Sequence, residues 1–178
     1  SLMRSRAKAV NFGIIYGIGD FSLSKDLGIT RKQAREYINQ YLNKYPKVKE
    51  YMHNIVQYGK ENGFVTTLFN RRRYLPELTS SNFNIRSFSE RVALNTPIQG
   101  TAADIIKIAM VKVHNELKSR NLKSRLILQV HDELLIETHK SEEETVKKLL
   151  KDSMEKAVKL LVPLKVEVKR GNNWYETK

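Results

Sequence analysis

The sequence predicts an α+β fold, and the order of its patterns is the main reason. Apolar residues at helical spacing dominate the first part of the chain, whereas strand-like runs mixed with helices follow later. Of the 178 residues 40% are hydrophobic, so the chain can bury a core although its mean hydropathy is -0.49. The length fits one compact domain or two lobes that share a core.

Four helices are expected in the first part of the chain. They cover residues 4–16, a short stretch ending at Leu27, residues 30–44 and the stretch from Pro46 to Gly63. Glycines at positions 17 and 19 are expected to end the first helix. Thr30 followed by Gln33 is a capping-box pair, in which each side chain bonds the backbone N–H of the other residue. Pro46 suits the first turn of a helix, where its missing N–H has no partner to lose.

A strand, a loop and a long helix come next. β-branched and aromatic residues at 64–68 predict a short strand that leads into a basic turn at Asn70–Arg73. Polar residues 80–84 indicate a loop. Helical spacing then runs from about residue 85 to residue 120. A kink or break is expected near residues 97–100, because proline cannot donate the helical hydrogen bond.

The last part of the chain mixes strands with helices. Residues 126–137 hold two apolar runs around a polar tip and predict a β-hairpin. Ser141 with Glu144 is a second capping-box pair, which is expected to open a helix that reaches about Leu161. Alternation of apolar and polar residues at 164–168 predicts a final strand.

Composition excludes several classes of protein. The chain has no cysteine, so disulfides and cysteine-bound metals are excluded. No apolar run reaches the roughly 18 residues of a membrane span, and residues 1–10 are charged where a signal peptide is apolar, so we expect a cytoplasmic protein. The net charge of +13 indicates a polyanionic partner. Residues 1–75 hold 14 Lys and Arg against 5 Asp and Glu, a net +9, so the charge lies mainly in the first half.

A row of four side chains marks the first predicted helix. Arg4, Lys8, Phe12 and Tyr16 recur every four residues and therefore share one helix face. Two cations followed by two rings could hold a phosphate chain at one end and stack a base at the other. An ordinary surface helix whose rings cover the edge of the core would show the same spacing, and spacing alone leaves both interpretations open.

A second row, Arg91, Asn95 and Gln99, lies in the long predicted helix. Asn and Gln suit hydrogen bonds to bases or sugars, although such residues on a helix are more often simply solvated. The run Arg71-Arg72-Arg73 could clamp phosphates, each contact adding to a salt-dependent affinity. Three successive arginines are also common in a solvated turn, so this run is suggestive only.

The polar tip of the predicted hairpin is the strongest chemical feature. His131, Asp132 and Glu133 lie between two apolar strands. Adjacent carboxylates at the tip of a buried hairpin are electrostatically costly unless a cation compensates, and oxygen ligands suit Mg²⁺. A plain polar turn is the alternative, but Asp132-Glu133 lacks the Gly or Asn that tight turns favour. The tip is therefore interpreted as half of a metal site.

Three of these motifs together resemble a known family. Arg4–Gly17 resembles motif B, the O helix, of family A DNA polymerases of the bacterial DNA polymerase I type, and Gln129–Glu133 resembles their motif C. Arg91–Asp104 and Phe69–Pro76 resemble segments that lie between these motifs. The resemblance covers nearly the whole chain in the family's order. It implies helical fingers over residues 1–80 and a partial palm with an antiparallel sheet over residues 81–178.

The resemblance implies roles for the first row. Arg4 and Lys8 would bind the triphosphate of an incoming deoxynucleotide, with Lys8 adding charge near the developing pyrophosphate. Phe12 would pack on the base and sugar and favour nucleotides that carry a 3′-hydroxyl. Tyr16 would stack beside the templating position.

It also implies roles for the remaining candidates. Arg91, Asn95 and Gln99 would touch primer and template near the growing end, and the three arginines at 71–73 would bind DNA. His131 would lie near the primer terminus. Asp132, with Glu133 beside it, would help hold two magnesium ions during attack of the primer 3′-hydroxyl on the nucleotide. The implied partners are primer–template DNA and deoxynucleoside triphosphates.

One departure from the family's pattern limits this expectation. The family's motif A, which supplies the other essential carboxylate, should precede motif B, and the chain begins almost at motif B. We therefore expect a carboxy-terminal fragment of a polymerase that is inactive alone. The alternatives are a basic nucleic-acid-binding module without catalysis and, less favoured, an HD-type phosphohydrolase built on His131 and Asp132. An exposed edge of the palm sheet could also pair with a second copy of the chain.

Overall fold

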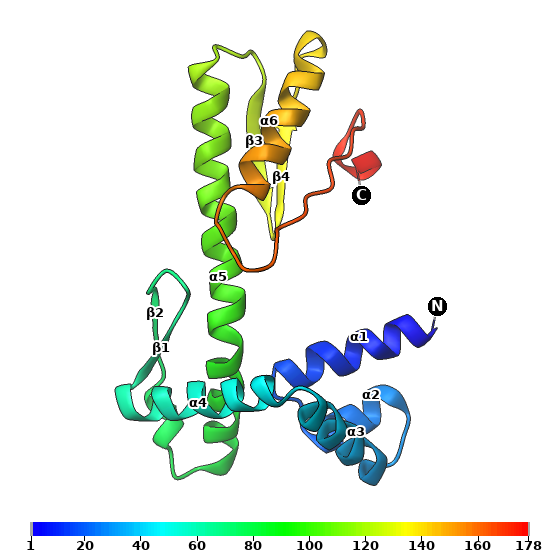
Figure 1. The fold of residues 1–178 in the computed structure, drawn as a ribbon, viewed down its shortest axis with the longest axis vertical. Coiled ribbons are helices and arrows are strands. Elements are labelled where there is room, and N and C mark those ends of the chain that lie inside the picture. The colour runs from blue at the N-terminus through cyan, green and yellow to red at the C-terminus, as the bar shows by residue number, and fades with distance from the viewer. Residues whose placement is uncertain (1, 178) are drawn as a thin grey trace. The chain divides into compact units, whose positions relative to one another are not determined.

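The computed structural model describes residues 2–177, and the backbone alone of residues 2, 5 and 6 (Figure 1). Two pairs of antiparallel strands accompany the helices, which confirms the α+β class. The elements are α1 (Leu2–Ile15), α2 (Asp20–Leu27), α3 (Arg31–Lys44), α4 (Pro46–Asn62), β1 (Phe64–Thr66), β2 (Arg72–Tyr74), the 3₁₀ helix η1 (Pro76–Thr79), α5 (Phe83–Ser119), β3 (Arg125–Val130), β4 (Glu133–Glu137), η2 (Lys140–Glu142), α6 (Glu143–Glu155) and η3 (Trp174–Thr177).

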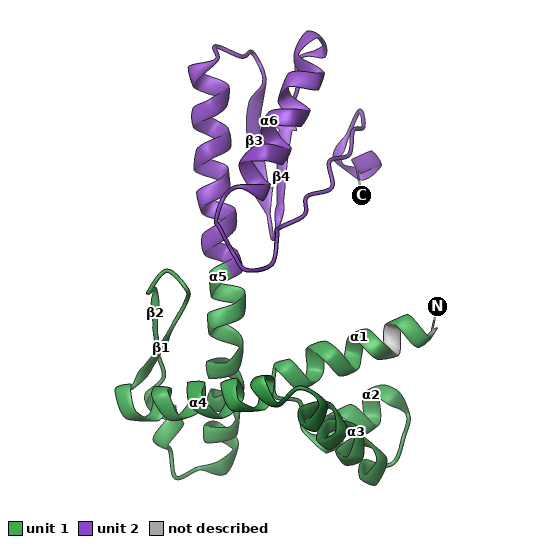
Figure 2. Ribbon diagram, viewed as in Figure 1, with its two compact units in different colours: residues 1–101 green, residues 102–178 purple. Residues whose placement is uncertain are grey.

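The chain divides into two compact units, residues 1–101 and residues 102–178 (Figure 2). The division falls inside α5, which contributes its first part to unit 1 and its second part to unit 2. Compact units need not coincide with functional subdomains, so the assignment of fingers to residues 1–80 and palm to residues 81–178 stays a prediction. No helix within residues 2–177 is both long and apolar enough to cross a membrane.

Helices α1, α2 and α3 form one small cluster in unit 1. Leu23, Leu27 and Ala34 are buried at its centre, and Val10 of α1 packs against them. The capping box expected at the start of α3 is present, because Gln33 N–H donates to the Thr30 hydroxyl while the Gln33 side chain accepts from the Thr30 backbone.

An ion-pair network ties α2 to α3. Asp20, at the first position of α2, accepts from Arg31 Nε at 2.8 Å and from Arg35 Nη2 at 2.7 Å. The hydrogen bond from Arg35, the bond from Arg31 and their charges hold the pKa of Asp20 below its usual value of 3.8. The pair of arginines therefore fixes the angle between the two helices from the solvent side.

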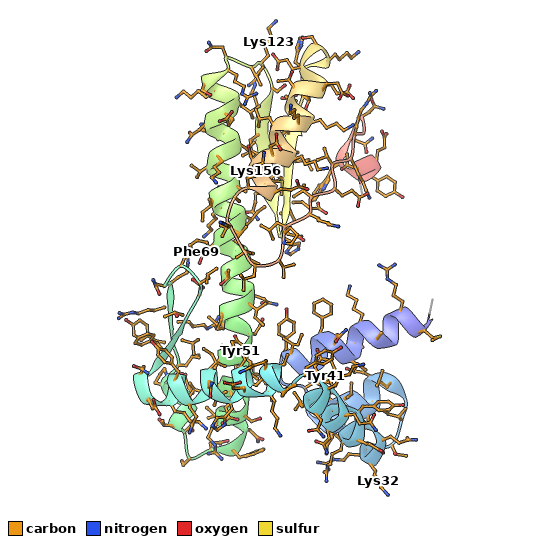
Figure 3. All side chains as sticks on the ribbon, viewed as in Figure 1. Lys32, Tyr41, Tyr51, Phe69, Lys123 and Lys156 are labelled. Atoms are coloured by element: carbon orange, nitrogen blue, oxygen red, sulfur yellow. The ribbon has the colours of Figure 1, made fainter. Side chains whose placement is uncertain are left out.

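The rest of unit 1 packs α4, the β1–β2 hairpin and the first part of α5 around a second core. Val65, Leu75, Leu78 and Ala93 are buried there. The hairpin register places Phe64 opposite Tyr74, Val65 opposite Arg73 and Thr66 opposite Arg72. Its tip carries Phe69, which lies at the end of the hairpin in Figure 3.

The structure corrects the expected basic turn at 70–73. Arg72 and Arg73 belong to strand β2, and the turn spans the preceding residues, with Asn70 in the left-handed region at a φ of 62°. Thr67 organises this turn, since its buried hydroxyl accepts from the backbone N–H groups of Phe69 and Arg71, each at 3.2 Å. The turn lies earlier in the sequence than expected, because these hydrogen bonds to the Thr67 hydroxyl close it before Arg72.

The expected break in the long helix is absent, because α5 is helical throughout Phe83–Ser119 with Pro97 inside it. Proline removes one backbone hydrogen-bond donor from the helix. In the preceding turn, the Thr96 hydroxyl donates a hydrogen bond to the Val92 carbonyl at 2.7 Å. Buried residues flank the proline on both sides, Leu94 before it and Ile106 after it. Packing on both sides outweighs the loss of a single helical hydrogen bond.

Unit 2 packs the second part of α5 and α6 against the β3–β4 hairpin. Its core holds Ile106, Ala109, Val113, Leu117, Leu134, Val146, Leu149 and Ala157. Strands β3 and β4 pair in antiparallel fashion, with an irregularity between Leu126 and Leu128 that leaves Ile127 56% exposed. The predicted hairpin at residues 126–137 is confirmed.

Three expectations for the C-terminal part are wrong. The capping box of Ser141 and Glu144 does not form, because the Ser141 hydroxyl contacts His139 Nδ1 at 2.8 Å and the N-cap of α6 is Glu142, with no side-chain cap. Helix α6 ends at Glu155. Residues 164–168 form no strand, since Val166 N–H donates to the carboxylate of Glu155 at 3.1 Å in place of a ladder partner.

The Asp20 network yields a prediction about pH. Because the folded pKa of Asp20 is lowered, its stabilising effect is present above a pH of about 4 and is lost as pH falls through the lowered pKa. Asp20→Asn should therefore lower the free energy of unfolding at pH 7, and the difference from wild type should shrink towards pH 2. Urea unfolding over this range measures it.

Asp26→Asn is the matched control, since Asp26 is an exposed aspartate of the same helix. It should change the free energy of unfolding little at any pH. A deficit in Asp20→Asn that stays constant with pH would contradict the ion-pair explanation.

Candidate functional site

The predicted row lies along α1, with Tyr16 one residue past the end of the helix, and contacts join its last three members. Lys8 Nζ lies 5.8 Å from the centre of the Phe12 ring, and the rings of Phe12 and Tyr16 are 6.2 Å apart at an angle of 38°. Arg4 and Lys8 are exposed, and Phe12 is 51% exposed. Ile14, on another side of the helix, is 1% exposed. The rings of the row are therefore not needed to fill the core, which weighs against the interpretation as an ordinary surface helix.

Tyr16 ends this row at a cavity of about 420 Å³ inside unit 1. Four other predicted DNA-binding residues line the same cavity: Arg73, Arg91, Asn95 and Gln99. They come from β2 and from one face of α5, so three separate parts of the sequence meet here. The remaining lining residues are Phe88, Val92, Thr96 and Gly100.

Two glycines allow these elements to approach each other. An added Cβ on Gly17, whose φ is 77°, would lie 2.8 Å from Leu94 Cδ1 of α5. An added Cβ on Gly100 would lie 2.6 Å from Thr67 Cγ2 at the base of the hairpin turn. Real Cβ atoms do not come this close, so a side chain at either position would force Leu94 or Thr67 to shift, and glycine lets these elements pack as they do.

The polar groups of the cavity are only partly paired. Arg91 Nη1 donates to Ser87 Oγ at 3.2 Å, and its guanidinium lies 5.8 Å from the centre of the Phe88 ring. Asn95 Oδ1 is buried and has no hydrogen-bond partner among the described residues. A buried acceptor without a partner is costly, so Asn95 Oδ1 carries an unfavourable energetic term in this structure.

The three predicted arginines do not act as one cluster. Strand alternation separates Arg72 from Arg73, because neighbouring residues of a strand point to opposite faces of the sheet. Arg73 shares its face with buried Val65 and lines the cavity, whereas Arg72 shares the other face with Phe64 and Tyr74. Arg71 precedes the strand.

The hairpin of unit 2 holds the predicted metal ligands at its tip. Val130 pairs with Glu133, so His131 and Asp132 form a two-residue turn with His131 at a φ of 50°. His131, Asp132 and Glu133 are all exposed, which corrects the expectation of a buried tip. The turn is tight without Gly or Asn because His131 itself adopts the left-handed conformation, and Gln129 Nε2 donates to its carbonyl at 2.8 Å.

Asp132 and Glu133 offer oxygen donors of the kind that Mg²⁺ prefers. Their exposure removes the electrostatic cost on which the metal interpretation was based, so the donor chemistry alone now supports it. Within residues 2–177 no group of three or more His, Asp and Glu gathers around a common point. A complete metal site would therefore need at least one further ligand besides these two.

Several lining residues were not predicted. Phe88, Val92, Thr96 and Gly100 complete the face of α5 that carries Arg91, Asn95 and Gln99. Phe88, Val92 and Thr96 each lie three residues before a predicted position, a helical spacing that could have found them. A second cavity of about 520 Å³ shares Arg91 and includes the Lys60–Glu90 ion pair, whose Nζ and Oε1 atoms are 2.9 Å apart.

Unit 1 thus carries a row of cations and rings that ends in a basic cavity, an arrangement typical of nucleotide- and nucleic-acid-binding proteins. The chain belongs to DNA polymerase family A, since the sequence model of that family matches residues 1–176. It is 60% identical over 176 residues to DNA polymerase I of Caldicellulosiruptor bescii, covering 99% of this chain and 21% of that protein. It is 58% identical over 178 residues to DNA polymerase I of Bacillus subtilis, covering 100% of this chain and 20% of that protein.

The fold also matches a solved structure. The POL domain of Pol1 from M. smegmatis, in complex with DNA primer-template and dNTP, superposes with a TM-score of 0.96 at 41% identity. The match covers 99% of this chain and 31% of that one. The chain thus spans about a fifth of the length of the curated relatives that it matches.

Asn95 yields a prediction about stability. Asn95→Leu keeps the approximate shape of the side chain and removes the buried oxygen that has no partner. In the absence of DNA the variant should gain about 1 kcal/mol in free energy of unfolding. Its affinity for primer–template DNA should fall, because the ligand loses an acceptor.

Denaturant unfolding and a DNA titration measure the two effects. Asn84→Leu, at an exposed position near the start of the same helix, is the control and should gain nothing. A loss of stability in Asn95→Leu would show that its side chain already has a partner within the protein.

Proposed function

We propose that this chain is part of a template-directed DNA polymerase, which transfers a nucleotide from a deoxynucleoside triphosphate to the 3′-hydroxyl of a primer. The observation that supports it best is the meeting of Tyr16 with Arg73, Arg91, Asn95 and Gln99 at one cavity. Membership of the polymerase family and the ligands of the M. smegmatis neighbour agree with it. The substrates are then primer–template DNA and deoxynucleoside triphosphates.

The exposed face of α1 would receive the incoming nucleotide. Arg4 and Lys8 would bind the triphosphate, which two cations one helical turn apart can contact together. Phe12, half exposed beside Lys8, would pack on the base and sugar. Lys8 would in addition neutralise negative charge as pyrophosphate leaves.

The cavity would hold primer and template next to that nucleotide. Tyr16 would stack beside the templating base, since it links the α1 row to the cavity. Asn95 and Gln99 would donate and accept hydrogen bonds at base and sugar edges, and Arg91 and Arg73 would contact phosphates. The arginines Arg71 and Arg72 would add to DNA binding from outside the cavity.

Asp132 and Glu133 would provide carboxylate ligands for two Mg²⁺ ions. When bound, these ions would lower the pKa of the primer hydroxyl and stabilise charge on the phosphates. His131 would lie near the primer terminus. The remaining carboxylate would come from a motif A segment of a longer polypeptide, so residues 1–178 alone should not extend a primer.

A basic nucleic-acid-binding module without catalysis is the second candidate. The net charge of +13 and the presence of only two adjacent carboxylates at the hairpin tip favour it for residues 1–178 by themselves. It requires DNA binding that weakens steeply with salt, because phosphate contacts release counterions. Binding that stays unchanged between 50 and 200 mM salt, roughly the range over which such contacts are lost, would exclude it.

Two further expectations stay proposals. The protein would act in the cytoplasm, where chromosomal DNA lies. The outer edge of β3, where Ile127 and Leu128 are 56% and 41% exposed, could pair with a second copy of residues 1–178. A molecular mass in solution that does not rise with concentration would exclude such pairing.

Asp132 tests the proposed catalysis directly. In the full-length polypeptide, Asp132→Asn should reduce primer extension by about 100-fold or more while DNA affinity changes little, since it removes a metal ligand and leaves the basic cavity intact. Single-turnover extension and a DNA titration separate the two quantities. Asp152→Asn removes a carboxylate that pairs with Lys156 on α6, and this control should leave extension unchanged. Full extension by Asp132→Asn would refute the assignment.

A further inference from the structure

The β1–β2 hairpin has a second face that the proposed polymerase site does not use. Val65 and Arg73 point to one side, where Val65 is buried and Arg73 lines the cavity. Phe64 and Thr66 of β1, together with Arg72 and Tyr74 of β2, point to the other side. We call Tyr58, Phe64, Arg72 and Tyr74 the outer face of the hairpin, because Tyr58 of α4 contacts Phe64.

The outer face is a row of three rings with a cation over the middle one. The ring of Phe64 lies 5.9 Å from that of Tyr58 and 5.8 Å from that of Tyr74, with interplanar angles of 86° and 64°. The guanidinium carbon of Arg72 lies 4.6 Å from the centre of the Phe64 ring. These contacts fix the ring orientations, so the row is preorganised before any ligand arrives.

The row is also unusually open to solvent. Tyr74 is 67% exposed and Tyr58 is 40% exposed. The core beneath the hairpin is already filled by Val65, Leu75 and Leu78, and it does not need the tyrosine rings. Arg72 is exposed and forms no ion pair within the described part of the chain, so its charge is available to an anion.

We propose that the outer face of the hairpin binds single-stranded nucleic acid by stacking. One base would stack on the exposed ring of Tyr74 and a neighbouring base would contact Tyr58, while Arg72 stays on Phe64 and reaches the phosphate between them. Aromatic rings beside a free guanidinium are the combination that holds single strands with little dependence on sequence. Bases in a duplex are stacked on each other, so the outer face selects the single strand.

This inference does not depend on polymerase activity. Arg72 and Arg73 point to opposite faces of the hairpin, so the outer face is separate from the cavity that contains Tyr16 and Arg73. A protein without primer extension could therefore still bind single strands here. Conversely, loss of this binding would leave the proposed nucleotide site untouched.

The test compares two single strands of equal length and charge. One is an oligothymidylate, and the other carries abasic residues along the same phosphate backbone. Fluorescence anisotropy with the full chain should show that the thymidine strand binds about fivefold or more tightly than the abasic strand, because a stacked base contributes an amount of this order. Tyr74→Leu should abolish most of that difference in affinity. Arg72→Gln should lower the affinity for both strands.

Tyr37→Leu is the matched control, since Tyr37 is a 46% exposed tyrosine of α3 outside the outer face. It should keep the full difference between the strands, and thermal unfolding should confirm that both leucine variants are folded. In addition, photocrosslinking to a strand with 5-iododeoxyuridine should label Tyr74 or Tyr58. Equal binding of the two strands, or a difference that survives in Tyr74→Leu, would overturn the proposal, as would crosslinks confined to α1.

Discussion

The site in unit 1 depends on two close approaches at glycines: Gly17 packs against Leu94 of α5, and Thr67 of the hairpin packs against Gly100 of α5. Leu94 occupies the space that a side chain at Gly17 would need, and Thr67 occupies the space at Gly100. A side chain at either glycine would force Leu94 or Thr67 to shift, and the packing that brings Tyr16, Arg73 and Asn95 to one cavity would be disturbed. The cavity thus depends on close backbone packing at Gly17 and Gly100. Its polar side chains line a space that this packing creates.

Strand alternation is the second determinant, and it divides a single run of arginines between two surfaces. Residues that are adjacent in β2 point to opposite sides, so the fixed register of the hairpin gives Arg73 to the cavity and Arg72 to the outer face. A shift of the register by one residue would exchange them, and buried Val65 opposite Arg73 prevents such a shift because its side chain would become exposed. Burial of Val65 in the apolar core therefore determines that Arg73 lines the cavity and Arg72 lies on the outer face.

The parts of the fold that were predictable are those fixed within a few residues. Thr30 and Gln33 lie three residues apart and form the expected capping box, and Gly28 and Gly63 end their helices in the left-handed region. The row on α1 could be predicted for the same reason. The predictions failed where a residue far away in the sequence determines the local structure. At the start of α6 the carboxylate of Glu142 accepts from Lys123 N–H at 2.9 Å, a contact that no local pattern of capping residues contains. The backbone and hydroxyl of Ser124 hold the same carboxylate.

The candidate site follows the same rule. Spacing identified Arg91, Asn95 and Gln99 as one face, but it could not show that Tyr16 and Arg73 join them, because that depends on how three elements pack. Exposure of the hairpin tip was also inaccessible to sequence, since it depends on where strand pairing stops.

Asn95 in unit 1 and the hairpin tip in unit 2 carry different energetic costs in the free protein. Asn95 Oδ1 is buried without a partner, so unit 1 bears an unfavourable term before any ligand binds. Asp132 and Glu133 are solvated, so their charges cost little until a cation or a DNA strand displaces the water around them. In the proposed polymerase, the two carboxylates would therefore need a cation only once bound DNA or nucleotide displaces that water.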